Sequence, residues 1–146
     1  MTTVAEILKS KADHHIYAVE PGATVFEALQ LMAEKGIGAL LIKQGAKIVG
    51  IFTERDYARK IALMGRDSAH TPVSEVMTTS VLFVQSSQTS EECMQLMTGK
   101  RLRHLPVVDE GQLVGLVSIG DLVKEIISAQ QFTIAQLEHY IHGGNA

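Results

Sequence analysis

The stretch VGIFTERD at Val49–Asp56 occurs again in related form 65 residues later, as VGLVSIGD at Val114–Asp121. Extending both stretches outward without a gap aligns residues 16–61 with residues 81–126 and gives twelve identities in 46 positions. Two copies of one short unit, each too small to bury a good core alone, predict two related halves that pack as a pseudo-twofold pair. A cleft between such halves is expected to occur twice.

Each copy predicts the element order strand, helix, strand, strand, helix. Thr24 with Glu27, and Thr89 with Glu92, have the spacing of a capping box, which marks a helix start in both copies. Apolar residues at helical spacing follow, and two apolar runs separated by a turn then predict a hairpin. The elements are expected at residues 16–19, from 24, 39–42, 48–52 and 56–63 in the first copy, and at 81–84, from 89, 105–108, 113–117 and 121–128 in the second.

The repeat boundaries predict three segments: a first repeat with an N-terminal lead-in at 1–68, a second repeat at 69–130, and a C-terminal helical extension at 131–146. A helical lead-in is expected before each copy because Val4–Leu8 resembles Val73–Met77, and Gly65–Pro72 is expected to link the copies. An apolar stripe outside two closed units is typical of a surface that packs on a neighbour or a second chain. In the extension this stripe consists of Ile134, Leu137 and Ile141.

The composition is that of an ordinary soluble globular protein, with 146 residues, 46% hydrophobic residues, 20% charged residues and a formal net charge of -3. The slightly acidic balance argues against a generic nucleic-acid-binding surface, which needs a positive face. The lone Cys93 excludes an intrachain disulfide and is expected to be a buried small hydrophobe. Neither a secretory pattern nor a run of 18 apolar residues is present, so a cytoplasmic location and no membrane partner are expected.

The two stretches quoted above match a family pattern of Gly, two apolar residues, Ser or Thr, two variable residues and Asp. Leu102–Asp109 is similar to the second-strand signature of the same family. Over about residues 4–130 the chain therefore resembles a tandem pair of cystathionine-beta-synthase (CBS) domains, a Bateman module, in a stand-alone protein of bacterial type. The resemblance implies an α/β (α+β) fold of two β-α-β-β-α repeats packed through their sheets, followed by the C-terminal helical extension.

Many members of this family bind adenine nucleotides in the two clefts, and others bind nothing. The resemblance thus implies a regulatory module that senses AMP, ATP or NAD, forms a homodimer and signals to an effector protein whose identity is unknown. A constitutive interaction scaffold with empty clefts, and a nucleic-acid-binding module, are the alternatives. No nucleophile elbow, P-loop or dinucleotide fingerprint is present, so neither enzymatic activity nor a catalytic cofactor is expected. A metal site is not expected either, because only His139 and His142 share a helix face.

Asp56 and Asp121 stand where a strand passes into a helix, and each can be read in two ways. As a structural residue, the carboxylate accepts N–H groups of the first helical turn. As a binding residue, it accepts hydrogen bonds from both hydroxyls of a ribose. Thr53 and Ser118 can add a hydroxyl near ribose or phosphate, and their alternative is a bond within their own turn.

The other candidate ligand contacts follow from the resemblance. Arg55 could bind a phosphate through its guanidinium or lie as a solvated side chain, and Gly120 takes the same place in the second copy. The adenine is expected against Ile16, Tyr17, Ile37, Gly38 and Ala39, and its counterpart against Leu82, Leu102, Arg103 and His104. Tyr17 could equally be a core aromatic, and the basic run Lys100–His104 a solvated helix end. Because the two copies differ at these places, the two clefts are expected to be unequal.

Overall fold

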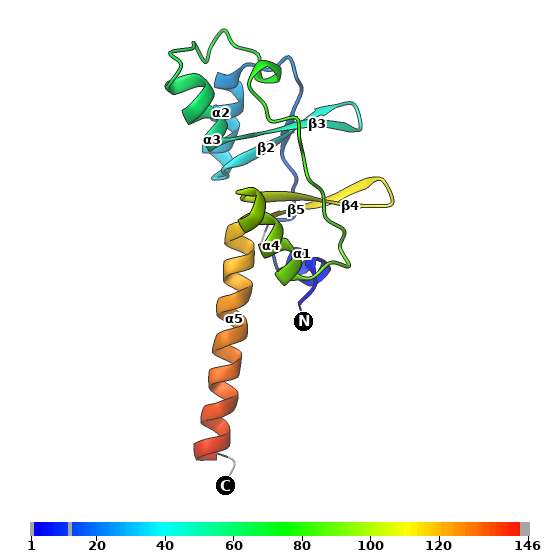
Figure 1. The fold of residues 1–146 in the computed structure, drawn as a ribbon, viewed down its shortest axis with the longest axis vertical. Coiled ribbons are helices and arrows are strands. Elements are labelled where there is room, and N and C mark those ends of the chain that lie inside the picture. Colours follow the sequence, from blue (N-terminus) through cyan, green and yellow to red (C-terminus); the bar gives the residue numbers. More distant parts are fainter. Residues whose placement is uncertain (1, 12, 144–146) are drawn as a thin grey trace. The chain divides into compact units, whose positions relative to one another are not determined.

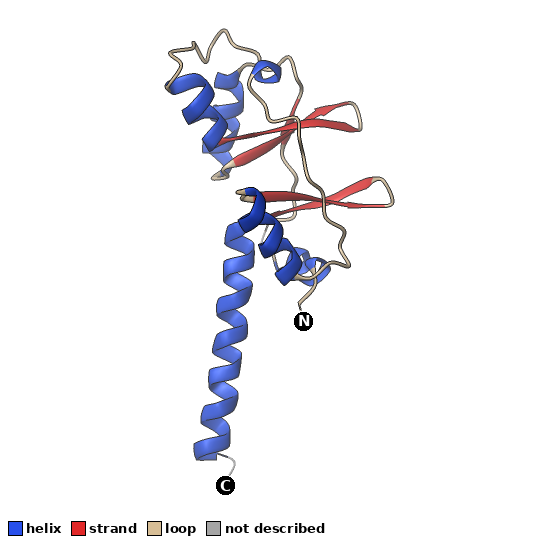
Figure 2. Cartoon of the chain, viewed as in Figure 1, coloured by secondary structure: helices blue, strands red, loops and turns tan. Residues whose placement is uncertain are grey.

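The computed structural model describes residues 2–11 and 13–143, which fold into two compact units (Figure 1). Residues His15–Leu82 form the first-repeat unit, and the residues up to His14 join those from Phe83 onward in the second-repeat unit. In each unit the helices lie on one face of a small sheet (Figure 2). The expected mixed α/β fold with two small sheets and a C-terminal helix is confirmed.

The first-repeat unit is built on a three-stranded sheet of order β1-β2-β3, with β1 parallel and β3 antiparallel to β2. Its helix α2 begins at the expected cap, where the Thr24 hydroxyl accepts the Glu27 N–H at 3.1 Å, and it ends at Gly36 in the left-handed conformation (φ 66°). The elements are β1 Ala18–Val19, α2 Val25–Lys35, β2 Ala39–Gln44, β3 Lys47–Thr53, α3 Glu54–Asp56, the π-helical turn η1 Tyr57–Ala62 and the 3₁₀ turn η2 Val73–Glu75.

The core of this unit lies between α2 and the sheet. It consists of Val25, Ala28, Met32, Leu40, Ile42, Phe52, Ile61, Val73 and Val76, all below 5% exposure. The expected linker belongs to the unit as well, because Thr71 is buried and its carbonyl accepts the Val25 N–H at 2.8 Å. The segment therefore packs on the start of α2.

The second-repeat unit repeats this plan around the antiparallel pair β4–β5. Helix α4 has a complete capping box between Thr89 and Glu92, and Cys93 on its inner face is buried as expected. Burial raises the pKa of the Cys93 thiol. The elements are α1 Val4–Ser10, α4 Ser90–Lys100, β4 His104–Asp109, β5 Gln112–Ser118, α5 Ile119–Glu138 and the π-helical turn η3 His139–Gly143.

Four expected elements differ from the structure. The helix expected at 56–63 begins at Glu54 as α3 and continues from Tyr57 as the π-helical turn η1. The first strand is reduced from 16–19 to Ala18–Val19, and the strand expected at 81–84 is a single parallel bridge between Val84 and Val107. Val84 satisfies both of its backbone groups there, with Pro106 and Val108, so one residue makes the whole pairing. The extension expected to start at residue 131 is continuous with the second helix of its repeat, as the single helix α5.

The two lead-in segments are exchanged between the units. The lead-in α1 packs in the second-repeat unit, where Val4 donates its N–H to the Gln88 carbonyl at 2.8 Å. Residues 73–78 pack in the first-repeat unit, where Thr78 and Ile51 exchange two backbone hydrogen bonds of 2.8 and 2.9 Å. The compact units thus differ from the sequence segments 1–68 and 69–130, because each repeat completes its core with the segment that precedes the other.

Candidate functional site

In the first-repeat unit, the candidate residues gather at one edge of the sheet. This edge holds the start of β1, the start of β2 and the end of β3, since β1 and β2 are parallel and Ala39 pairs with Thr53. Two hydrogen bonds fasten it: the Leu41 N–H donates to the Tyr17 carbonyl at 3.3 Å and the Glu54 N–H to the Gly38 carbonyl at 3.1 Å. The candidates at this edge are Ile16, Tyr17, Ile37, Gly38, Ala39, Thr53, Arg55 and Asp56.

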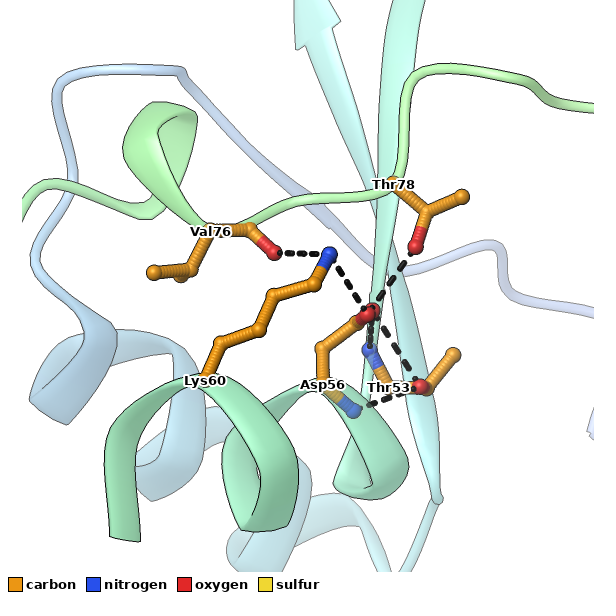
Figure 3. Close-up of polar contacts among 5 residues, drawn as sticks. All are labelled: Thr53, Asp56, Lys60, Val76 and Thr78. Atoms are coloured by element: carbon orange, nitrogen blue, oxygen red, sulfur yellow. Dashed lines mark hydrogen bonds and ion pairs between the residues drawn. The ribbon is translucent and has the colours of Figure 1, made fainter. Parts of the chain in front are cut away.

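The Asp56 carboxylate forms several hydrogen bonds and an ion pair at this edge (Figure 3). Its Oδ2 accepts the Thr53 N–H at 3.0 Å and the Thr53 hydroxyl at 3.2 Å, while the Asp56 N–H donates to the Thr53 hydroxyl. Its Oδ1 accepts the Thr78 hydroxyl at 2.9 Å and lies 3.1 Å from Lys60 Nζ, which also donates to the Val76 carbonyl. Asp56 is 7% exposed, so its charge is stabilised by these donors rather than by water.

The Asp121 carboxylate has a related but more open setting in the second-repeat unit. Its Oδ2 accepts the Ser118 N–H at 2.9 Å and lies 3.0 Å from Lys11 Nζ, while the Asp121 N–H donates to the Ser118 hydroxyl at 3.1 Å. Lys11 also donates to the Leu116 carbonyl at 2.8 Å. The cation here comes from the residue that follows α1, whereas Lys60 lies one turn after Asp56 on the same helix.

The structural role of both aspartates is therefore present: each completes a capping box with the Thr or Ser three residues earlier. Sequence reasoning missed Lys60, Thr78 and Lys11 as partners of these carboxylates. The i, i+4 spacing of Asp56 and Lys60 was a usable signal, because residues at that spacing face each other on a helix. Thr78 and Lys11 had no such signal, because they reach the carboxylates through the exchanged lead-in segments.

The residues expected to face an adenine have mixed exposure. Ile16, Tyr17, Ile37 and Gly38 are half-buried, and Ala39 is buried. Tyr17 packs against the core, stacks on the His15 ring with centroids 6.0 Å apart, and has Lys35 Nζ 5.4 Å from its ring centroid. The reading of Tyr17 as a core aromatic is thus supported by its contacts.

In the second-repeat unit, the equivalent edge is closed by the Ile119 N–H, which donates to the Arg103 carbonyl at 2.8 Å, and by the pairing of His104 with Ser118. Arg103 is exposed and His104 is half-buried. Burial lowers the pKa of His104, the Asp121 carboxylate opposes this shift, and Lys11 and Arg103 add to it. Of Arg103 and His104, Arg103 is therefore the better cation for a phosphate.

The remaining candidates of this unit lie near the same edge or at its border. Leu102 is half-buried two residues before β4, and Gly120 is exposed in the first turn of α5. Leu82, which belongs to the second copy in the sequence, is the last residue of the first-repeat unit and is 37% exposed. Among residues 2–11 and 13–143, no three His, Cys, Asp or Glu side chains are grouped as metal ligands, and no helix is long and apolar enough to cross a membrane.

The lowered pKa of His104 predicts that the stability of the fold depends on pH. Because the pKa of His104 is lower in the folded chain than its ordinary value of 6.5, the unfolded chain takes up a proton first as the pH falls, so stability is full above pH 6.5 and is lost below it. Between pH 7.5 and 5.5 we expect the parent to lose more stability than the His104→Gln variant, with an added slope of at most about 1.4 kcal/mol per pH unit. Urea unfolding at both pH values measures this, and equal slopes for the two proteins would contradict the assignment.

Comparison with known sequences decides the family. The sequence profile of the CBS domain matches residues 4–63 and 73–128, which are the two repeats with their lead-in segments. The chain belongs to the CBS domain family. Pairs of CBS domains are regulatory modules, which agrees with the two repeats found in the sequence.

Two similar proteins cover nearly the whole CBS pair. The mitochondrial CBS domain-containing protein CBSX3 of Arabidopsis thaliana is 37% identical, over 98% of this chain and 73% of its own length. A proposed signal-transduction protein with CBS domains from Burkholderia ambifaria MC40-6 is 58% identical, with a TM-score of 0.86, over 91% of this chain and 99% of its own. Neither is named as an enzyme.

A third similar structure shares the fold at lower identity. It is a CBS domain pair crystallised in complex with 5'-methylthioadenosine and S-adenosyl-L-methionine, 24% identical to this chain, with a TM-score of 0.73 over 89% of this chain and 98% of its own. At this identity the likeness concerns the fold.

Proposed function

We propose that this CBS pair is a regulatory module that binds an adenosyl nucleotide such as AMP, ATP or NAD at its two sheet edges. The observation that carries the proposal is the duplicated junction in which a hydroxyl residue and an aspartate, Thr53 with Asp56 and Ser118 with Asp121, stand where a strand passes into a helix. A carboxylate with several acceptor positions suits the two hydroxyls of a ribose. The complex of a related fold with two adenosyl ligands supports this chemistry.

The contacts of Asp56 define what such a ligand must do. The carboxylate already accepts hydrogen bonds from Thr53 and Thr78 and pairs with Lys60, so ribose hydroxyls would have to replace one of these partners. The Lys60 side chain is 43% accessible, so its ammonium can leave the carboxylate for water at little cost in hydration. On release it can turn toward a phosphate. At the second edge Lys11 has the same relation to Asp121.

The two edges carry their arginines at different places: Arg55 lies in the first helical turn, two residues after Thr53, whereas Gly120 takes that place after Ser118 and Arg103 directly precedes β4. Nothing in the structure requires glycine at position 120, where an added Cβ would meet only the Ser118 hydroxyl oxygen, at 3.6 Å. The Asp56 edge is therefore suited to a ligand with more phosphate charge or to a dinucleotide, and the Asp121 edge to a monophosphate such as AMP.

Exchanging the two residues tests this asymmetry. We expect Arg55→Gly to weaken the binding of ATP roughly tenfold, because one charge-assisted contact to phosphate is lost. The binding of AMP should be less affected. Gly120→Arg should strengthen ATP at the other edge, and the double variant should return the total affinity toward that of the parent. Isothermal titration with ATP and with AMP measures each constant. Equal changes for both nucleotides, or none, would contradict the assignment.

Signalling by this module requires that the nucleotide bind one state of the protein better than another. We propose that the state is read by a separate effector protein and that the chain acts as a homodimer. The cytoplasmic location expected from the sequence stays a prediction.

A further inference from the structure

Helix α5 carries a stripe of side chains spaced by alternating steps of four and three residues. It consists of Val123, Ile127, Gln130, Ile134 and Leu137, and the spacing continues to Ile141. The apolar members are between 44% and 59% exposed. Alternating steps of four and three place the stripe on the seam of a coiled coil, with Ile127 and Ile134 at a positions and Val123, Gln130 and Leu137 at d positions.

The C-terminal part of α5 is not covered by its own unit. Leu122 is the last buried residue of the helix, and from Ile126 to His142 every residue is exposed. Figure 1 shows this segment running out beyond α1, α4, β4 and β5 of the same unit. Its 17 residues extend for roughly 25 Å. An apolar face of this length gives a helix its stability by packing on another surface.

The charge of the segment limits what can cover it. Between Glu125 and Glu138 the sequence contains no charged residue, so neither an acidic nor a basic partner would be recognised by ion pairs. A neutral seam can meet its own copy without opposing like charges. We propose that α5 forms a parallel, two-stranded coiled coil with α5 of a second copy of this chain.

Gln130 indicates the orientation. Buried against an apolar residue, its amide would lose its hydrogen bonds to water, which is costly. In a parallel pair in register, Gln130 faces the partner's Gln130, and each amide can both donate and accept. In an antiparallel pair centred on the stripe, it would face the partner's Ile134. Within a parallel coiled coil, the β-branched Ile127 and Ile134 at a positions with Leu137 at d favour two strands.

Two neighbouring substitutions test the surface. Ile134→Glu places a charge in the seam, and Ala135→Glu places the same charge on the outer face, because the next residue is turned by about 100°. By sedimentation at micromolar concentration we expect a dimer for the parent and Ala135→Glu, and a monomer for Ile134→Glu, with at least a hundredfold weaker association. An equal thermal melt of the two repeat units in both variants shows that they are folded. A monomeric parent, or a dimeric Ile134→Glu variant, overturns the proposal.

A cysteine pair tests the orientation. Two cysteines can join only when their Cα atoms approach within roughly 7 Å, which a parallel pair achieves for identical d positions. The native Cys93 is buried and stays out of the reaction. Under mild oxidation we expect Leu137→Cys to form a cross-linked dimer rapidly and Ala135→Cys, on the outer face, to do so at least tenfold more slowly. Equal rates for the two variants, or no cross-link for Leu137→Cys, overturn the parallel pairing.

Discussion

Replacing Asp56 with Ala is expected to lower the free energy of unfolding by about 2 to 3 kcal/mol, because hydrogen bonds to a charged group contribute about that much. Asp56 is 7% exposed, and its carboxylate accepts hydrogen bonds from Thr53 and Thr78 and forms an ion pair with Lys60. Its removal leaves the Thr53 N–H and the Thr78 hydroxyl without their acceptor in a part of the fold that water reaches poorly. Lys60 loses little, since its exposed ammonium can return to water.

The second repeat offers the matched control for this substitution. Asp121→Ala removes a more exposed carboxylate that has fewer donors, and a loss of about 1 kcal/mol is expected, which is typical of a helix-start residue. Lys60→Met removes the ion pair and keeps the hydrogen bonds of the carboxylate, so it should lower the free energy of unfolding by less than Asp56→Ala. Urea unfolding of the three variants measures the order. Equal losses for Asp56→Ala and Asp121→Ala would show that Asp56 contributes no more than the helix start.

Replacing Gly50 with Val is expected to lower stability by about 3 kcal/mol, at the upper end of what overpacking costs. A Cβ at this position would lie 2.6 Å from Met77 Sδ and 3.0 Å from the Thr78 carbonyl oxygen. The methionine can yield, but the Thr78 carbonyl accepts the Ile51 N–H at 2.9 Å and is held in place. Moving it would also withdraw the Thr78 hydroxyl from Asp56.

Gly115 is the matching position in the second repeat and gives the control. A Cβ there would meet the side chain of Leu8, at 2.6 and 2.8 Å from its two methyl carbons, and side chains yield more readily than backbone. We therefore expect Gly115→Val to cost less than Gly50→Val, and Leu8→Ala to relieve most of its cost while Met77→Ala relieves only part of the other. Thermal melts of the two single and two double variants measure this. A larger loss for Gly115→Val would contradict the explanation.

These glycines show what the sequence could and could not predict. The periodic signals were local and were confirmed: the helix starts at Thr24 and Thr89, the apolar stripes of α2 and α4, and the two hairpins. The predicted capping box is complete only at Thr89 and Glu92. Gly50 and Gly115 were visible as repeated residues, but the reason for them was not, because they make room for the segments that precede the opposite repeats. A contact made by such an exchange leaves no periodicity in either segment.

Part of the candidate site could likewise be predicted from the sequence and part could not. Its hydroxyl and aspartate residues follow from the repeated stretch, and the sheet-edge position of Thr53 and Ser118 follows from the hairpins. The partners Thr78 and Lys11 could not be found, since they are distant in sequence from the carboxylates that they contact. The lowered pKa of His104 depends on burial, which a sequence position does not reveal.

Titration of the full chain with AMP, ATP, NAD and S-adenosylmethionine tests the proposed function most directly. The heat of binding is measured by isothermal calorimetry and the melting temperature by thermal unfolding. A ligand that binds the folded state at a hundred times its Kd stabilises it by about 2.7 kcal/mol. We predict that at least one of these nucleotides gives saturable heat and raises the melting temperature, and that Asp56→Asn together with Asp121→Asn abolishes both effects while the fold is kept. If no adenosyl compound binds the folded parent at millimolar concentration, the chain is not a nucleotide sensor.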